Sequence, residues 1–411
     1  MDKLLLRNIV SLFSIQAVNY LLPLLIIPLL IRVLGIELFG VYILIFTVVQ
    51  YFIIASDYGF NLTATRKIAI NIDDKKYVSK VFYSVIAAKL LIALAGLVVM
   101  NVFILLSAKY SSQALYLNVA YLSVFGGVFF PVWLYQAYEK MTWIAICNFI
   151  SRVTGVILVF LFVNHPDDLG LSILIQGMMP VIAAVIALRY CFKNDMVCRT
   201  SFKFKDIITE LKDGWDIFVS TSFVSLYTTS IPLILGATSG VQSVGVFSAA
   251  DKIRLALQAV INPISQALYP RFSKLVSKQE KDKAKELLLA VIKFFLIPFC
   301  VFTFILMLGS DFIINKLYGP ELPGAVSVLQ ILIWIPPIVA VANLLGIQIM
   351  LPKGMTKQFS ITYIISGIVG FPLLFIGARY FSYIGVSVVS IIIELIVVSL
   401  FGYFILKSRK A

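Results

Sequence analysis

Charged side chains stand well inside the apolar segment 246–270, which is long enough to cross a bilayer as a helix. They are Asp251, Lys252 and Arg254. An ionised group at the centre of a membrane helix costs about 2.5–3.5 kcal/mol on insertion scales, so such groups normally face a protein interior or water. The segment therefore predicts an interior with polar walls.

Polar residues of this segment gather on one face when it is wound as a helix. That face carries Asp251, Arg254, Gln258, Asn262 and Ser265, with Lys252 at its edge. Asp251 and Arg254, three residues apart, could simply neutralise each other. Alternatively the face lines a hydrated cavity, which would also explain Lys252 and the amides. The second interpretation predicts that Lys252, Arg254 and Gln258 contact a substrate.

Other apolar segments also hold polar residues within their length. The candidates are Gln50 and Asp57, Lys89, Asn148 and Arg152, Thr228, and Glu394. A hydroxyl such as that of Thr228 also occurs where helices simply pack closely. Glu394 could carry a proton between the two sides of the membrane or pair with a structural cation. Polar faces in both halves of the chain predict a shared hydrated cavity.

The composition is that of an integral membrane protein. Of 411 residues, 61% are hydrophobic and 13% are charged, and the mean hydropathy is +1.00. The net charge of +14 comes from short basic runs between apolar segments, which does not indicate a nucleic-acid partner. The four cysteines lack ligand spacing, and motifs of ATP hydrolysis, metalloproteases and serine hydrolases do not occur. We therefore expect no catalytic residue, no metal and no cofactor.

Twelve apolar runs of about 20 residues predict an all-α fold of twelve transmembrane helices. They lie at 9–31, 39–60, 79–106, 114–136, 144–164, 169–190, 215–236, 246–270, 287–309, 325–350, 360–378 and 383–406. Most lysines and arginines fall in the connectors of one side, together with both termini. The positive-inside rule therefore places both termini in the cytosol.

A basic connector divides the runs into two sets of six. The residues around Gly40 are weakly echoed around Gly245, as GVY and GVF. Six helices followed by six in the same orientation form a parallel repeat. We expect an N-terminal lobe at 1–190, a cytosolic linker at 191–214 and a C-terminal lobe at 215–411, arranged around a central cavity.

Several stretches along nearly the whole chain resemble one family. They are NIVSLFSIQAVNYLLPLLIIPLLIRVLGIELFGVY, DYGFNLTATRKIA, PVWLYQAYEKM, GVFSAADKIR, LYPRFS and LYGPELPGAVSVLQIL. They resemble the bacterial O-antigen and polysaccharide repeat-unit flippases of the multidrug, oligosaccharidyl-lipid and polysaccharide exporter superfamily. This resemblance implies a two-lobed bundle in the bacterial inner membrane that moves an undecaprenyl-diphosphate-linked oligosaccharide from the cytosolic to the periplasmic leaflet.

The residues agree with what the resemblance implies. A glycan cannot enter hydrocarbon without losing its hydrogen bonds, and cations suit a diphosphate. We expect Arg254, Lys252, Arg152 and Lys89 to attract the anionic part, and Gln50, Asn148, Thr228 and Gln258 to bind sugars. Glu394, Asp57 and Asp251 are candidates for coupling to H⁺ or Na⁺, which the resemblance also implies. It leaves open whether a polysaccharide polymerase and a chain-length regulator bind.

Two other functions compete with this one. A multidrug or cation antiporter of the same superfamily would need acidic cavity walls, whereas basic residues dominate the apolar segments here. A membrane glycan polymerase or ligase, as an enzyme, would resemble chains with a sizeable outer catalytic loop, and the outer connectors here are short. The sequence therefore favours a flippase that is not an enzyme.

Overall fold

The computed structural model describes residues 3–106, 111–278, 280–320 and 322–410, and these residues form helices without any strand. In chain order the elements are α1 Lys3–Asp57, α2 Phe60–Ile70, α3 Lys75–Leu106, α5 Ala114–Ala120, α6 Leu122–Phe129, α7 Val132–Ala137, α8 Met141–Phe162, η1 Pro166–Asp168, α9 Leu169–Lys193, α10 Phe204–Thr229, α11 Ile231–Thr238, α12 Val241–Gln258, α13 Ile261–Ser277, α14 Lys281–Val291, η2 Ile292–Leu296, α15 Ile297–Leu308, α16 Ser310–Tyr318, α17 Pro323–Leu332, α18 Ile335–Asn343, η3 Leu344–Met350 and α19 Thr356–Lys410. The predicted all-α class is confirmed.

Within the described residues, eight helical stretches are long and apolar enough to cross a membrane. Two of them, Leu24–Ile70 and Thr356–Ser408, each contain a predicted boundary between two runs, where a single residue departs from helical dihedral angles. The break in α1 is at Gly35 (φ 76°) and that in α19 is at Ser382 (φ 50°). The polar helices α10 and α12 are not among the eight. The chain is thus a multi-pass membrane protein by helix length and composition.

Prolines lie at several points where the helices are interrupted. Pro131 separates α6 from α7, Pro232 lies in the first turn of α11, and Pro298 is the second residue of α15, which follows the π-helix η2. Pro336 and Pro337 form the first turn of α18. A proline lacks the amide donor that an uninterrupted helix needs, so these positions end or redirect the chain.

The predicted helix 246–270 is divided in the structure, which corrects the sequence analysis. α12 ends at Gln258 and α13 begins at Ile261. Between them the Val260 amide donates to the carbonyl oxygen of Leu257, three residues back instead of four. The tightened turn separates the charged part of the segment from its C-terminal part.

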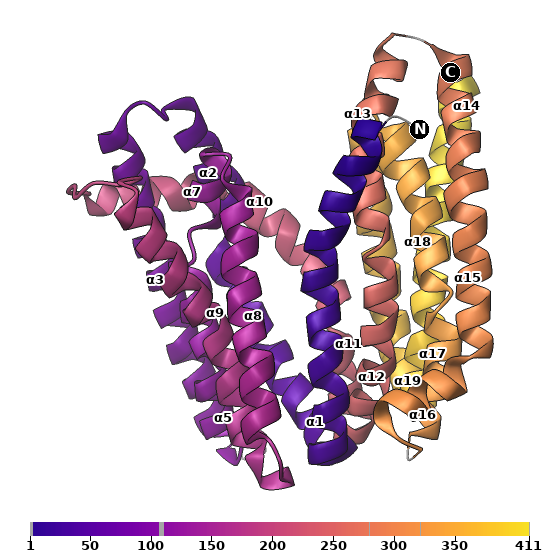
Figure 1. Ribbon diagram of the computed structural model, residues 1–411, viewed down its shortest axis with the longest axis horizontal. Helices are drawn as coiled ribbons and strands as arrows, with labels where there is room; N and C mark the ends of the chain where they lie inside the picture. The colour runs from indigo at the N-terminus through magenta and orange to yellow at the C-terminus, as the bar shows by residue number, and fades with distance from the viewer. Residues whose placement is uncertain (1–2, 107–110, 279, 321, 411) are drawn as a thin grey trace. The chain divides into compact units, whose positions relative to one another are not determined.

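The chain forms two compact units, and one of them combines distant parts of the sequence. The first unit consists of Met1–Val41 and Ser230–Ala411, and the second is Tyr42–Thr229. In the second unit, α9 packs against α6 and α8, and Figure 1 shows α8 and α9 side by side. In the first unit, α12 packs against α17, and α19 contacts α11 and α18.

Arg32 fastens the first part of α1 within the first unit. Its Nε donates to the carbonyl oxygen of Leu317 at 3.0 Å, and its Nη2 donates to that of Lys316. These carbonyls belong to the last turn of α16 and have no acceptor role inside the helix. The guanidinium therefore caps the C-terminus of α16, where positive charge is favourable.

The two glycines of the internal echo meet at a close helix crossing. A Cβ on Gly40 would overlap the carbonyl oxygen of Val241, and one on Gly245 would overlap that of Ile36. Only glycine allows the backbones of α1 and α12 to approach this closely. The glycines at equivalent places of the weak repeat thus contact each other's helices.

Gly40→Val should prevent this crossing and lower the thermal unfolding temperature of the detergent-solubilised protein by several degrees. The added side chain meets backbone atoms, which cannot move aside as a flexible side chain can. The control is Gly402→Ala in α19, where a Cβ meets open space and should stabilise the helix by about 0.5–1 kcal/mol. Equal unfolding temperatures for Gly40→Val and the unsubstituted protein would contradict the close crossing.

Candidate functional site

Asp251, Arg254 and Gln258 form a hydrogen-bonded row along α12. The Arg254 guanidinium contacts Asp251 Oδ1 through Nη2 at 2.6 Å and through Nε at 2.7 Å, and its Nη1 donates to Gln258 Oε1. The side chains of Asp251 and Arg254 are 19% and 16% exposed. The charges of Asp251 and Arg254 therefore compensate each other locally, as one of the two interpretations predicted.

Lys252 is the least compensated charge of α12. It is half-buried, and it makes no hydrogen bond or ion pair with any other residue that the structure describes. Its ammonium interacts only at longer range with Asp251 and Arg254, whose opposite charges partly cancel. A half-buried cation without a nearby anion is energetically costly. A bound anionic ligand would offset that cost.

Glu394 brings a second acidic group to this region from α19. It is half-buried and close enough to Arg254 for the two charges to interact. Both residues belong to the first compact unit. Arg254 is thus placed between an ion-paired carboxylate on its own helix and a more distant one on α19.

Lys89 and Asp57 form the charged centre of the second unit. The Lys89 ammonium lies 2.8 Å from Asp57 Oδ1 and donates to the Gly127 carbonyl oxygen at 2.8 Å. It also lies 4.9 Å from the centroid of the Trp133 ring, within the range of a cation–π interaction. The Lys89 side chain is 2% exposed, whereas that of Asp57 is 41% exposed. The carboxylate is the accessible member of this pair.

The remaining sequence-predicted residues stand at other places in the second unit. Gln50 is exposed on α1, and Asn148 and Arg152 are half-buried on α8. The neighbouring Ser151 donates to the Met179 carbonyl oxygen and packs α8 on α9. The side chain of Thr228 lies outside the described residues. The structure therefore groups Asp251, Arg254 and Gln258, and separately Asp57 and Lys89.

A third charged cluster, which the sequence analysis did not identify, fixes the start of α10. Lys67 Nζ lies 2.8 Å from Glu210 Oε2 and 2.6 Å from Asp213 Oδ2, and Lys80 Nζ lies 2.8 Å from Asp206 Oδ1. Burial raises the pKa of Glu210 against the opposing effect of Lys67. Hydrogen bonds from Lys80 and from the Lys203 amide lower the pKa of Asp206. Residues 204–214 of the predicted linker are thus helical and ion-paired.

Removing the Lys67 side chain should loosen this part of α10. In Lys67→Ala, the buried Glu210 carboxylate loses its cation, which is strongly destabilising for a buried pair. We expect trypsin to cleave the connector between α9 and α10 several-fold faster than in the unsubstituted protein. Lys80→Ala is the control, because its pair with Asp206 is more exposed and should matter less. Unchanged cleavage in Lys67→Ala would contradict a structural role of the cluster.

No group of three or more His, Cys, Asp or Glu side chains within the described ranges could hold a metal ion. The chemistry of these clusters is instead that of charge and hydrogen bonding. Together with membrane-length helices that carry ionised groups, it is the chemistry of charged sites within a multi-pass membrane protein.

Comparison with solved structures gives the same class. The fold matches that of the lipid II flippase MurJ in an inward closed conformation, with a TM-score of 0.77 over 96% of this chain and 87% of that one at 17% identity. The chain therefore shares this fold.

Sequence comparison then gives the family. The model of the polysaccharide biosynthesis protein family matches residues 5–276. A protein of Escherichia coli (strain K12) named "Putative O-antigen transporter" is 35% identical over 98% of this chain and 97% of its own length. A Shigella dysenteriae protein of the same name is 30% identical over 98% and 100%. The chain belongs to the polysaccharide biosynthesis protein family.

Proposed function

We propose that this protein is a flippase for lipid-linked oligosaccharides. Its substrate is an undecaprenyl-diphosphate-linked repeat unit of O-antigen or a similar surface polysaccharide, moved from the cytosolic to the periplasmic leaflet. The observation that carries this proposal is the similarity, over nearly the full length of both chains, to relatives named as O-antigen transporters. The fold shared with a lipid II flippase supports it, as do ionised side chains within membrane-length helices.

The finer architecture belongs to the same proposal. Twelve transmembrane helices would form two lobes, 1–190 and 215–411, joined by the linker 191–214, with the cavity between them. The breaks at Gly35 and Ser382 support it, because each divides one continuous helix into two membrane-length parts. Alternating access of the two lobes would carry the headgroup across. The protein would lie in the bacterial inner membrane with both termini in the cytosol.

The cations of α12 are suited to the diphosphate. Lys252 has no partner to release among the described residues, so it can bind a phosphate oxygen without breaking an existing pair. Arg254 keeps its side chain ordered through Asp251 and Gln258, and Gln258 can also meet sugar hydroxyls. Charge-assisted hydrogen bonds of this kind are worth about 1.5–3 kcal/mol each.

The second unit supplies further contacts in this proposal. Arg152 would add a cation, and Gln50, Asn148 and Thr228 would bind sugar hydroxyls. Lys89 would act by holding the Asp57 carboxylate, since its own ammonium already has an anion, a carbonyl and an aromatic ring around it. Glu394, Asp57 and Asp251 are the candidates for coupling to H⁺ or Na⁺. A polymerase and a chain-length regulator are candidate partners.

The rival proposal of a multidrug or cation antiporter fits these pairs less well. A cationic drug would need acidic groups that are not already neutralised, but Asp251 and Asp57 are each ion-paired with a basic side chain. A glycan polymerase or ligase would be an enzyme, whereas the relatives are named as transporters. We therefore place the flippase first.

Deleting the gene in its native host tests the proposal. We expect lipid-linked repeat units to accumulate facing the cytosol and surface polysaccharide to disappear, with both restored by the unsubstituted gene. Sidedness can be followed by labelling the glycan from outside in intact spheroplasts. Repeat units that still reach the outer leaflet at the normal rate without this protein would overturn the assignment.

A further inference from the structure

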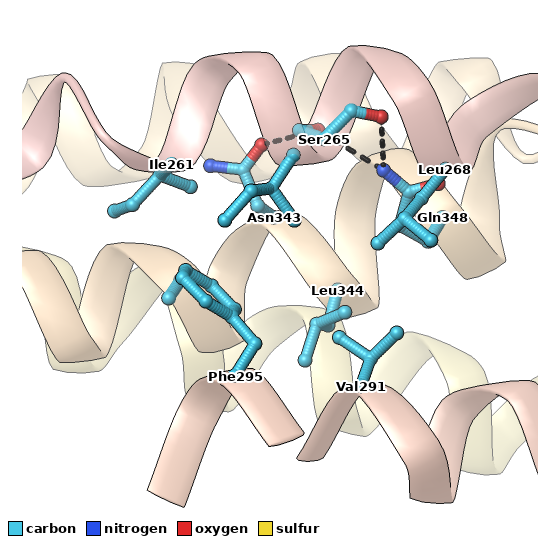
Figure 2. A pocket seen from close by; sticks show the side chains of 10 residues that line it. Ile261, Ser265, Leu268, Val291, Phe295, Asn343, Leu344 and Gln348 are labelled. Atoms are coloured by element: carbon cyan, nitrogen blue, oxygen red, sulfur yellow. Dashed lines mark hydrogen bonds between the residues drawn. The ribbon is translucent and has the colours of Figure 1, made fainter. Parts of the chain in front are cut away.

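A small pocket lies in the first unit, between α13, η2, α18 and η3 (Figure 2). Its walls are mostly apolar and include Leu268, Phe295 and Leu344, while Ser265, Asn343 and Gln348 are its polar members. The polar face of the segment 246–270 therefore does not end in solvent. Its last member, Ser265, meets two amide side chains that come from α18 and η3.

Ser265 is hydrogen-bonded to both amide side chains. Its hydroxyl donates to Asn343 Oδ1 at 3.2 Å. Gln348 Nε2 donates to the Ser265 carbonyl oxygen at 2.9 Å and to its Oγ at 3.0 Å. Figure 2 shows Asn343 and Gln348 on either side of Ser265. These bonds hold α13 against η3 and fix which end of the Gln348 amide points toward Ser265.

The other end of the Gln348 amide is left without a partner. Gln348 is 1% exposed, and its Oε1 is buried without a hydrogen bond from any residue that the structure describes. It is one of four buried side-chain atoms without a hydrogen-bond partner among the described residues. A buried acceptor without a donor is unfavourable, and each such group in a native protein calls for an explanation. One explanation is that a second conformation supplies the donor.

The elements around this oxygen depart from regular α-helical hydrogen bonding. η3, which holds Gln348, is a π-helix, and so is η2 across the pocket. Single-turn π-helices are less regular than α-helices and occur frequently at functional sites. α13 itself follows the tightened turn at Ala259 and Val260. A hinge at this turn would let α13 move along η3 without carrying all of α12 with it.

A suitable donor lies three residues before Ser265. Asn262 belongs to the same polar face, and it is exposed in this conformation. Moving α13 by three residues, about 4.5 Å along its axis, with a rotation of about 60° about that axis would bring Asn262 to the place of Ser265. Its primary amide could donate to Gln348 Oε1, whereas the Ser265 hydroxyl is already used by Asn343. Shifts of about one turn are known in switching proteins.

We propose that Gln348 is a two-register switch that bonds Ser265 in this conformation and Asn262 in another. The inference rests on the proposed function, because alternating access is what requires a second conformation. In the first register α13 is held by Ser265. In the second register, Asn262 donates to Gln348 Oε1, which is unpaired here. A different hydrogen bond therefore stabilises each conformation.

Cross-linking tests the two registers directly. In a chain whose native cysteines are replaced by alanine and which still transports, two double variants are made: Ser265→Cys with Gln348→Cys, and Asn262→Cys with Gln348→Cys. A short bis-methanethiosulfonate reagent is added to membranes, and cross-linked peptides are scored by mass spectrometry. We expect both pairs to cross-link. Each cross-link should lower transport at least tenfold, and reduction should restore it.

Single substitutions supply an independent readout. Asn262→Ala should lower transport at least tenfold with an unchanged thermal unfolding temperature, because the exposed amide makes no hydrogen bond to another described residue in the present conformation. Gln242→Ala, an exposed amide on the opposite face of the α12 segment, is the matched control and should transport normally. If the hydrogen bonds between Ser265 and Gln348 only support the fold, Asn262→Ala should have no effect on transport.

The inference is overturned if the 265–348 pair cross-links, the 262–348 pair does not, and Asn262→Ala transports like the unsubstituted protein. Failure of the proposed function is separate. It would show as normal repeat-unit sidedness in the deletion strain, whereas the cross-linked peptides report the movement of α13 whatever the substrate is.

Discussion

Lys252→Gln should lower transport of the lipid-linked oligosaccharide at least tenfold while leaving the protein as stable as before, or more stable. The ammonium has no hydrogen-bond or ion-pair partner among the described residues, so its removal breaks no contact and relieves the cost of a half-buried charge. Loss of a charge-assisted bond worth about 1.5–3 kcal/mol corresponds to roughly 10- to 150-fold in affinity. Surface polysaccharide in the complemented deletion strain and the thermal unfolding temperature measure the two effects.

Lys293→Gln is the matched control for this prediction. Lys293 lies within a membrane-length helical stretch, and it is exposed and close to the Phe294 ring. Removing its charge should leave transport within about twofold of the unsubstituted protein. If Lys252→Gln transports normally, the cation of α12 is not used on the substrate. If it fails to insert, Lys252 has a structural role that its lack of contacts does not reveal.

The row along α12 shows how local spacing can be read from sequence. Residues three and four apart share a helix face, and the structure joins Asp251 to Arg254 and Arg254 to Gln258 by hydrogen bonds. The spacing could not show that the helix ends at Gln258. The residues at the interruption, Ala259 and Val260, are ordinary apolar ones, and only the hydrogen-bond pattern identifies the turn.

Contacts between residues that are far apart in the chain could not be predicted from the sequence. Lys89 and Asp57 are 32 residues apart on different helices, and their pairing depends on how α1 and α3 pack. The sequence analysis therefore gave them separate roles. Gln348 was overlooked for another reason. It lies within the apolar run 325–350, and nothing in the residue types there distinguishes a π-helix from an α-helix.

The helix count illustrates the same limit. Apolar runs predicted boundaries near Gly35 and Ser382, and the structure has a single non-helical residue at each place. The sequence could not show that each interruption is a turn of one residue, because only the glycine in the first case is typical of such a turn. The similarity of Gly40 to Gly245 was a better guide, because close approach of two helices requires the smallest side chain.

Asp57→Asn should destabilise the protein more than Lys89→Met does. The neutral amide of the first variant would leave the Lys89 ammonium, 2% exposed, without an anion, which costs about 3–5 kcal/mol for a buried pair. Lys89→Met leaves a carboxylate that is 41% exposed and can be hydrated, so its cost is smaller. The unfolding temperatures of the two variants in detergent should differ by several degrees in this order.

The double variant Asp57→Asn with Lys89→Met separates stability from function. Removing both charges leaves neither member of the pair as an unpaired buried ion, so the unfolding temperature should return close to that of the unsubstituted protein. Transport should nevertheless stay at least tenfold lower, because the half-exposed carboxylate that Lys89 holds in place is gone. Restored stability with restored transport would show that the pair only supports the fold. Restored stability without transport would identify Asp57 as the functional member, with Lys89 positioning it.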